Sequence, residues 1–248
     1  MFCDSVFRTA AWTILACLSC SQLALANTVF FDDFNDGDAG DGMPVTWAPE
    51  RGTWDASSGD YVASDPMQIV SISLVPEYNT LGETSVRTQV SAIGTTGLGP
   101  GVRRAPGPFG YVGFIDVDGT LGINRVDGAP AAIELASSVV PFNAVDKDVM
   151  LQIDAIGNEL SLWAWPVGDP MPDAPQLVVS DSTYATGAVG LISVTDNPSN
   201  SSGTFRFVHV ADMHIPEPST TTLVGMAGLG LLCLLLLQGT TRFLQKRP

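Results

Sequence analysis

Cysteine is nearly absent from this 248-residue chain, and where it lies decides which chemistry is excluded. The four cysteines are Cys3, Cys17, Cys20 and Cys233. The long middle of the chain therefore has neither a disulfide framework nor a thiolate metal site, and its stability must come from packing. Histidine is scarce as well, with only His209 and His214, and there is no Gly-x-Ser-x-Gly elbow. Nucleophilic catalysis of the serine hydrolase type thus has little support.

Basic residues are also few. Eleven lysines and arginines stand against 26 acidic residues, which gives a formal net charge of -15. Four of the eleven lie near the two ends of the chain: Arg8, Arg242, Lys246 and Arg247. Because binding to phosphate needs clustered lysine and arginine, nucleic acid is excluded as a partner. Such a surface suits a soluble exported domain and can attract divalent cations.

Residues 1–26 have the pattern of a secretory signal peptide. Ala10 to Leu18 is nearly all apolar, and Ala24-Leu25-Ala26 matches the small-x-small rule for cleavage. The first alternative, a buried helix, would need an apolar stripe, whereas this run is apolar on every side. The second, lipidation at Cys20, is disfavoured because a lipobox has leucine three residues before its cysteine, and that position is Cys17 in the segment Cys17-Leu18-Ser19. We therefore expect export.

A second apolar run, at about residues 220–238, predicts a transmembrane helix. With about 1.5 Å of rise per residue, an uncharged stretch of about 18 residues spans roughly 27 Å, just short of a typical hydrocarbon core of about 30 Å. The tail at 239–248 carries Arg242, Lys246 and Arg247. By the positive-inside rule this tail is cytoplasmic, and residues 27–215 face outward.

The middle of the chain reads as all-β. Clusters of Gly, Pro, Asn or Asp recur about every 8 to 12 residues, between short runs rich in Val, Ile, Thr and aromatic residues. "VMLQIDAIG" and "NELSLWAW" alternate apolar and polar residues on the two sides of Gly157-Asn158, which predicts a β-hairpin. In "TFRFVHV" the phenylalanines and the valines fall on opposite faces, so a bulge is expected there. About ten strands without a break in composition favour one two-sheet antiparallel sandwich over residues 27–215.

Several segments of the middle resemble the concanavalin A-like lectin/glucanase sandwiches, also called laminin G-like domains. The first is "FFDDFNDGDAGDGMPVTWAPERGTWDASSGDYVASD", the second "YVGFIDVDGTLGINRVDG", the third "LQIDAIGNELSLWAWPVGDPMPDAP", and the last strands would be "YATGAVGLISV" and "TFRFVHVAD". The resemblance covers nearly all of residues 27–215 and implies a jelly-roll fold. The fold alone does not decide between a binding protein and an enzyme.

Some enzymes of that superfamily hydrolyse glycans with two carboxylates on one strand, in a Glu-x-Asp-x-x-Glu pattern. Alternate residues of a strand share a face, which can set the acid and the nucleophile about 5 Å apart. The segments nearest to this pattern contain Asp116 with Asp118 and Asp154 with Glu159, and neither matches it. We therefore expect no enzymatic activity, and a glycoside hydrolase is the alternative.

The acidic loop "DDFNDGDAGDG" has the oxygen chemistry that Ca²⁺ prefers, although its spacing does not fit an EF-hand. Two interpretations stay open: a calcium site, or an ordinary solvated turn of Asp and Gly. The ligands of a calcium site would be Asp33, Asp36, Asp38 and Asp212. Asp33 and Asp212 would meet if the first and last strands of the sandwich pair.

Trp163 and Trp165 are the best candidates for a ligand platform. At positions i and i+2 of a strand they share a face, opposite Leu162 and Ala164. Exposed aromatic faces stack on sugar rings, so the pair can form a glycan platform. The alternative is that both faces of the sheet are covered and the pair belongs to the core.

The C-terminal segment 216–248 resembles the PEP-CTERM sorting signal of bacteria that form exopolysaccharide. Pro216-Glu217-Pro218, the short apolar span and the basic tail occur in the order of that signal. The two prolines favour an extended backbone that a processing enzyme can grip. The resemblance implies exosortase, a membrane transpeptidase, as a partner that removes the tail. A plain single-pass anchor is the alternative.

These patterns together predict an exported, non-enzymatic protein of the cell envelope, cell surface or extracellular matrix. Its sandwich would have a structural, adhesive or glycan-binding role, with exopolysaccharide or a cell-surface glycan as the expected ligand. Its C-terminal helix would first insert in the inner membrane, and sorting would follow.

Overall fold

The structure is a computed structural model. It describes residues 27–64, 70–93, 97–105, 107, 109–128, 132–144, 147–195 and 202–213. The predicted signal peptide, sorting motif, transmembrane helix and basic tail, together with His214, lie outside these ranges. Within these ranges, no helix combines the length and the apolar character that crossing a bilayer requires.

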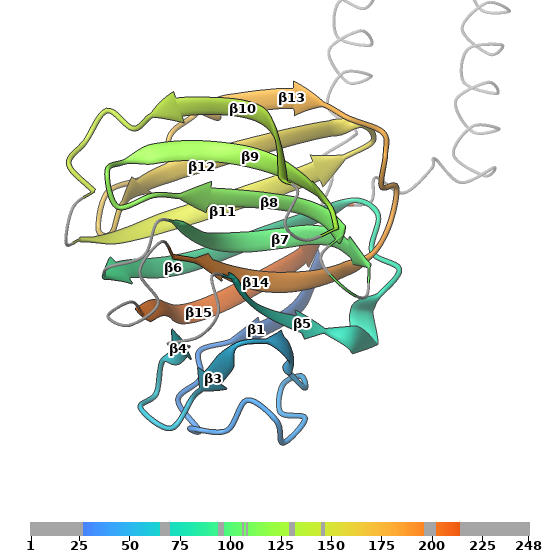
Figure 1. The fold of residues 1–248 in the computed structure, drawn as a ribbon, viewed down its shortest axis with the longest axis vertical. Coiled ribbons are helices and arrows are strands. Elements are labelled where there is room, and N and C mark those ends of the chain that lie inside the picture. The colour runs from blue at the N-terminus through green and yellow to red at the C-terminus, as the bar shows by residue number, and fades with distance from the viewer. Residues whose placement is uncertain are drawn as a thin grey trace, which may run out of the picture. The chain divides into compact units, whose positions relative to one another are not determined.

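The strands form two antiparallel sheets that stack as layers, with sheet B in front in Figure 1. Sheet A contains β1 (Asn27–Asp32), β3 (Thr53–Asp55), β4 (Tyr61–Ser64), β6 (Thr84–Ile93), β11 (Asp148–Ile156), β12 (Glu159–Pro166), β13 (Leu177–Ser180) and β15 (Ser202–Asp212). Sheet B contains β2 (Ala48–Arg51), β5 (Val70–Val75), β7 (Gly97–Ala105), β8 (Phe109–Ile115), β9 (Thr120–Asp127), β10 (Ala132–Val139) and β14 (Ala188–Val194). A 3-10 turn, η1 (Pro76–Tyr78), follows β5. The predicted two-sheet sandwich is confirmed.

The order of the strands places long central strands in each sheet. Sheet A runs β13-β12-β11-β6-β15-β4-β3, and β1 also pairs with β15. Sheet B runs β10-β9-β8-β7-β14-β5-β2. The chain passes from sheet B to sheet A at Gly52, between β2 and β3, where a φ of 77° suits glycine. The first and last described strands pair, which is the condition that the sequence analysis set for a meeting of Asp33 and Asp212.

The core lies between the sheets and follows the alternation of the strands. In the predicted hairpin, β11 and β12 pair from Val149 opposite Pro166 to Ile156 opposite Glu159, so the hairpin is confirmed. The apolar positions of both strands face inward and expose 2% or less of their surface: Val149, Leu151, Ile153, Ala155, Leu160, Leu162 and Ala164. Each large aliphatic side chain buried in this way contributes about 1.5 to 3 kcal/mol, so packing stabilises the fold.

The bulge expected in the last strand is present. The register of β15 against β6 shifts between Phe205 and Phe207. Phe205 therefore lies in the core, and after the shift Val208 and Val210 lie there too, all with no exposed surface. Phe207 points to the outer face, where its ring centroid is 5.7 Å from that of Phe31. One extra residue thus reconciles two apolar sets that the sequence places on opposite faces.

Strand β7 was not among the predicted strands, and it is central in sheet B. Its sequence, GLGPGVRRA, carries glycines and a proline, which usually indicate a loop. Nevertheless β7 pairs with β8 on one side and β14 on the other, and Leu98 and Val102 fill the core. Tertiary packing here overrides local propensity.

Candidate functional site on the outer face of sheet B

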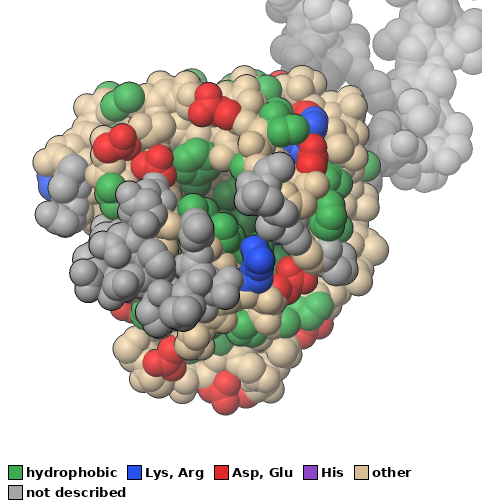
Figure 2. Space-filling view, in the orientation of Figure 1, with side chains coloured by type: hydrophobic (Ala, Val, Ile, Leu, Met, Phe, Trp, Pro, Cys, Tyr) green, Lys and Arg blue, Asp and Glu red, His purple; other side chains and the backbone are tan. Residues whose placement is uncertain are grey.

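A second apolar cluster lies outside the core, on the face of sheet B that points away from sheet A. Ile72, Leu74, Val112 and Ile192 form its buried part. Val70, Phe114, Val126 and Val194 pack against it. We call this surface the outer face of sheet B. In Figure 2, hydrophobic side chains gather in a hollow near the middle of this face. Because the outer face of a sheet is usually polar, an apolar cluster there makes this face a candidate binding surface.

Glycines make room for the cluster. Because Leu98 and Val102 point into the core, Gly97, Gly99 and Gly101 of β7 point to the outer face. A Cβ atom on Gly122 of β9 would overlap the ring of Phe114, so this ring lies flat across the sheet. The result is a shallow apolar floor without upright side chains along β7, a shape that accepts a flat ligand.

Arg103 and Arg104 lie near the end of β7, and a bulge at this point gives their side chains different surroundings. Arg103 has a φ of 52°, in the left-handed region, and the register against β8 shifts there. Arg103 is 3% exposed and well satisfied: its Nε donates to the carbonyl of Gly82 at 2.9 Å and its Nη1 to that of Tyr184 at 3.2 Å. Burial lowers its pKa from the ordinary value. This arginine has a structural role.

The side chain of Arg104, in contrast, lies along the outer face of sheet B. A Cβ atom at Gly101 or Gly110 would lie 3.0 Å from its Cδ, so both glycines make room for its stem. The side chain is 1% exposed, and only its Nη2 finds a described partner, the carbonyl of Gly107 at 3.3 Å. Its Nε and Nη1 are buried without any hydrogen-bond partner. Burial lowers the pKa of Arg104 to about 10, although the nearby charge of Glu50 opposes this shift.

Two more polar groups border the apolar floor. The Oδ1 atom of Asn124, next to Val112 across the β8–β9 pairing, is also buried without a partner. At the opposite end of β7 from Arg104, the carboxyl group of Asp116 lies against Gly97. Burial raises the pKa of Asp116 to about 6, and the charge of Asp118 adds to the shift. The floor thus has polar groups at both ends, about 20 Å apart along the strand.

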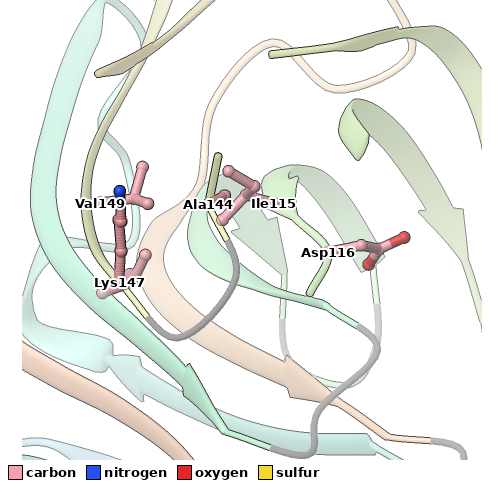
Figure 3. A pocket seen from close by; sticks show the side chains of 6 residues that line it. Ile115, Asp116, Ala144, Lys147 and Val149 are labelled. Atoms are coloured by element: carbon pink, nitrogen blue, oxygen red, sulfur yellow. The ribbon is translucent and has the colours of Figure 1, made fainter. Parts of the chain in front are cut away.

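A narrow opening lies next to Asp116, where the chain enters β11. Its lining consists of Val90, Ile115, Asp116, Ala144, Lys147 and Val149. Figure 3 shows that the carboxyl group of Asp116 points away from Lys147 and from the apolar side chains. The opening is therefore a gap at the end of the core, and Asp116 belongs to the outer face of sheet B.

The predicted tryptophan platform lies on the outer face of sheet A. Trp163 and Trp165 share this face, opposite Gln152 and Met150 in the pairing with β11. Trp165 is only 5% exposed, and the guanidinium carbon of Arg87 lies 5.7 Å from its ring centroid. Trp163 is partly exposed, and its Nε1 is buried without a partner. Most of the aromatic surface that a sugar would need is thus covered at Trp165.

Around the tryptophans, polar groups bind one another. Arg87 Nε donates to Gln152 Oε1 at 2.8 Å, and Gln152 Nε2 donates to Asp154 Oδ1 at 2.9 Å. Burial raises the pKa of Asp154, although hydrogen bonds from Ser85 and Gln152 oppose the shift. These contacts connect β6 with β11 and leave few free polar groups for a ligand.

In the acidic loop, the side chains bind the backbone of the loop itself. Asp33, Asp36 and Asp38 each accept a hydrogen bond from the amide two residues ahead, at 3.3, 3.0 and 2.8 Å. This pattern is the Asx turn, which explains the repeated Asp at this spacing. Within the described ranges, no group of three or more metal-ligating side chains gathers.

The expected approach of Asp33 to Asp212 is wrong. β1 and β15 do pair, but Asp212 lies opposite Asn27 and Val208 opposite Asp32. Because the pairing is antiparallel, Asp33 and Asp212 lie at opposite ends of it.

Carboxylate pairs for hydrolysis are not assembled at the segments considered. Asp118 turns back and accepts a hydrogen bond from the amide of Thr120 at 2.9 Å, which lowers its pKa. Asp154 belongs to the network of sheet A. His209 lies 3.0 Å from the hydroxyl of Thr28, and burial lowers its pKa. None of these residues is placed as a nucleophile with its base.

Sequence analysis missed the outer face of sheet B. The signal was present in GLGPGVRR, where glycines alternate with Leu98 and an arginine pair follows. An alternating Gly pattern beside apolar strands can indicate a floor kept free of side chains, but only once β7 is known to be a strand.

No family model matches the chain, and no curated protein matches it either. Solved structures do match. The carbohydrate-binding module CBM66 from Bacillus subtilis has a TM-score of 0.50 at 16% identity, over 65% of this chain and 92% of that one. The calcium-bound exoplasmic/lumenal domain of VIP36 has a TM-score of 0.56 at 13% identity, over 75% and 90%. A xylan β-1,4-xylosidase from Bacillus halodurans has a TM-score of 0.54 at 15% identity, over 73% of this chain but 38% of the enzyme. The described residues thus form a β-sandwich of the kind found in carbohydrate-binding modules and lectins, in agreement with the concanavalin A-like fold that the sequence resemblance implied.

Proposed function

We propose that this chain is an exported, non-enzymatic glycan-binding protein, and that the outer face of sheet B binds the glycan. The observation that carries the proposal is an apolar, glycine-lined floor bordered by the buried, unpartnered polar atoms of Arg104 and Asn124. Sugar rings have apolar faces and polar edges, so a flat apolar floor with hydrogen-bonding groups at its border complements them. Structural neighbours named as a carbohydrate-binding module and as a Ca²⁺/Man-bound form of the VIP36 exoplasmic/lumenal domain support the same role.

A polysaccharide array tests this proposal, with the full-length protein purified in detergent. Phe114→Ala removes the ring that forms the floor, and we expect at least about tenfold weaker binding. Phe31→Ala is the matched control, because Phe31 is 49% exposed on the other sheet. Binding that survives Phe114→Ala but is lost with Phe31→Ala would move the site to sheet A. Binding to none of the polysaccharides would refute the function.

The glycoside hydrolase remains the alternative, and the xylosidase neighbour is its support. A hydrolase would need a second carboxylate beside Asp116, whose raised pKa of about 6 suits a general acid. Release of reducing ends from a bound polysaccharide, abolished by Asp116→Asn, would establish it. A bound polysaccharide that stays intact supports a binding protein.

We further propose that exosortase sorts the chain through Pro216-Glu217-Pro218. The support is sequence only: this motif, the apolar span and the basic residues Arg242, Lys246 and Arg247 follow one another in the order of that signal. The chain would be inserted in the inner membrane and then released to the cell surface or matrix. Intact mass of the protein from its producing cell tests this. A species that ends near Pro218 supports sorting, and a species that retains the basic tail supports a plain anchor.

Calcium stays a proposal of lower rank, because Asp33 and Asp212 do not meet. The calcium-bound form of the VIP36 domain keeps the question open. Isothermal titration of the full chain with Ca²⁺ decides it. A stoichiometric site that Asp36→Asn removes would support the acidic loop as its place.

A further inference from the structure

Of the two arginines of β7, Arg104 is the one whose hydrogen-bond donors are mostly left without acceptors. Its neighbour Arg103 donates to two carbonyls, whereas Arg104 keeps two buried N–H groups, on Nε and Nη1, without acceptors. Leaving such groups unpaired costs free energy, and more when the group is charged. A side chain kept at this cost, over two glycines that make room for it, indicates a partner that arrives from outside.

The partner must be an acceptor, and its charge follows from the surroundings. Glu50 is the acid whose charge acts most on Arg104, but its Oε1 accepts from the Gly107 amide at 3.1 Å. Among the described residues the ion pairs are made by other arginines, Arg125 and Arg206. The guanidinium of Arg104 thus has no direct ion pair with any described residue, although the charge of Glu50 acts on it. Carboxylates match the planar fork of a guanidinium with two hydrogen bonds.

We propose that Arg104 receives a ligand carboxylate, and that the glycan on the outer face of sheet B is therefore acidic, carrying uronate or similarly carboxylated sugars. This inference rests on the glycan binding proposed above and names its ligand class. The apolar floor contacts the faces of the sugar rings, Asn124 Oδ1 accepts from a hydroxyl, and Arg104 holds the carboxylate at one end.

Gly107 sits between the two charges. Its carbonyl accepts from Arg104 and its amide donates to Glu50, so one residue occupies the place that a ligand carboxylate would take. Because Arg104 is 1% exposed and its Nη2 donates to the Gly107 carbonyl, a ligand carboxylate would replace this carbonyl as the acceptor. Gly107 has a φ of 83°, a backbone conformation that glycine adopts without strain.

The negative surface gives the interaction a distinctive salt dependence. With a net charge of -15, the chain repels an acidic polymer at long range. Salt screens this repulsion beyond about 10 Å, whereas a buried pair is screened much less. Affinity should therefore hold or rise as salt increases, which is the opposite of a basic surface that binds polyanions without selectivity.

The test compares two forms of one polymer, polygalacturonate and fully methyl-esterified polygalacturonate, on the full-length protein. The wild type should bind the acid form at least about tenfold more tightly than the ester. Arg104→Met should remove this difference, because the acid form loses the partner of its carboxylate, so that the acid and the ester bind within about twofold of each other. Arg104→Lys keeps the positive charge but lacks the planar guanidinium that donates two hydrogen bonds to a carboxylate. It should therefore recover only part of the preference for the acid form.

Thermal unfolding separates a receptor from a structural residue. Arg104→Met replaces an unsatisfied cation with an apolar chain of similar length, so the melting temperature should not fall. Arg103→Met is the matched control and should lower it, because two carbonyls lose their donors. A large fall with Arg104→Met would give Arg104 the structural role and overturn the inference.

The outcomes distinguish the two proposals. Equal binding of the acid and the ester by the wild type, or selectivity that persists in Arg104→Met, overturns the acidic ligand class and leaves glycan binding in place. A protein that binds no polysaccharide on the array fails the proposed function itself.

Discussion

The two outer faces of the sandwich differ in how their polar groups are satisfied. On sheet A, polar side chains bind one another, in chains such as Arg87–Gln152–Asp154 and Gln89–Asp148–Arg206. On sheet B, apolar residues and glycines form the surface, and the polar atoms of Arg104 and Asn124 lack partners. On sheet A, Trp163 Nε1 and Thr84 Oγ1 are the exceptions among the described residues.

This difference distinguishes a face whose polar groups stabilise the fold from the face on which we propose that a ligand binds. Satisfied networks add to stability and rigidity, because each buried group has its bond. Unsatisfied groups reduce stability and are kept where function needs them. Aromatic residues alone would have favoured the face of sheet A, and the accounting of hydrogen bonds favours the face of sheet B.

Among the variants that test this difference between the two faces, we expect the largest effect from Gly99→Ala, which disrupts the outer face of sheet B. The new Cβ would overlap the backbone carbonyl of Gly113, which cannot move aside. We expect a loss of more than about 3 kcal/mol in the free energy of unfolding. Urea unfolding measures it, and Gly40→Ala, whose Cβ meets only Asp38 Oδ1 at 3.4 Å, should change little. Equal stabilities would show that β7 and β8 are not packed as described.

Arg87→Ala tests the other face. It removes the bond to Gln152 at 2.8 Å and the cation over the Trp165 ring, so we expect a loss of about 1 to 2 kcal/mol of stability. Glycan binding should stay unchanged, as measured on the same polysaccharide array. A variant that keeps its stability but loses its ligand would reverse the roles of the two faces.

Asp116→Asn sharpens the comparison through pH. The folded pKa of about 6 lies above the usual value of about 3.9, so the folded state holds the proton more tightly. Stability is therefore lost as pH rises from about 4 to 6, and asparagine avoids this loss. Since Asp116 is partly exposed, we expect a gain of only about 1 kcal/mol at pH 7. Urea unfolding of the wild type and of Asp116→Asn at pH 4 and at pH 7 measures this gain in stability. A gain at pH 4 as large as the gain at pH 7 would contradict the raised pKa of Asp116.

The smallest effect is expected for Trp163→Ala on glycan binding, which should stay within about twofold. Trp165 is buried beside Arg87, so the pair offers little stacking surface. Titration of Trp163→Ala and of the wild type with the polysaccharide measures the change in affinity, and the stability of the variant is measured separately. Binding that is lost without unfolding would establish the tryptophan platform.

Sequence patterns predicted the sandwich where alternation is regular. The β11–β12 hairpin and the bulge of β15 follow from the spacing of apolar residues alone. Strand β7 escaped because its glycines and Pro100 carry the local signal of a loop, and only the neighbours β8 and β14 make it a strand. Local propensity cannot report pairing between distant segments.

The candidate site escaped for a related reason. Trp163 and Trp165 share a face as predicted, but the ring of Trp165 lies under Arg87, which is far away in sequence. For Arg104 the decisive fact is an absence of acceptors around a buried side chain, which only the folded chain reveals. The acidic loop is the opposite case, because its structure is local. Five of its aspartates each accept a hydrogen bond from the amide two residues ahead, and the sequence alone indicates such Asx turns.

The position of β15 has a mechanical consequence. This strand, the last one described, pairs with β6 from Ser202 to Asp212 and with β1 and β4 on its other edge. A pull along the chain beyond Asp212 would load these hydrogen bonds together in shear rather than opening them one at a time. A glycan held on sheet B would oppose that pull from the other layer, so tension would pass through the hydrophobic core between the sheets. A chain tethered beyond its last strand would thus resist force along its strongest direction.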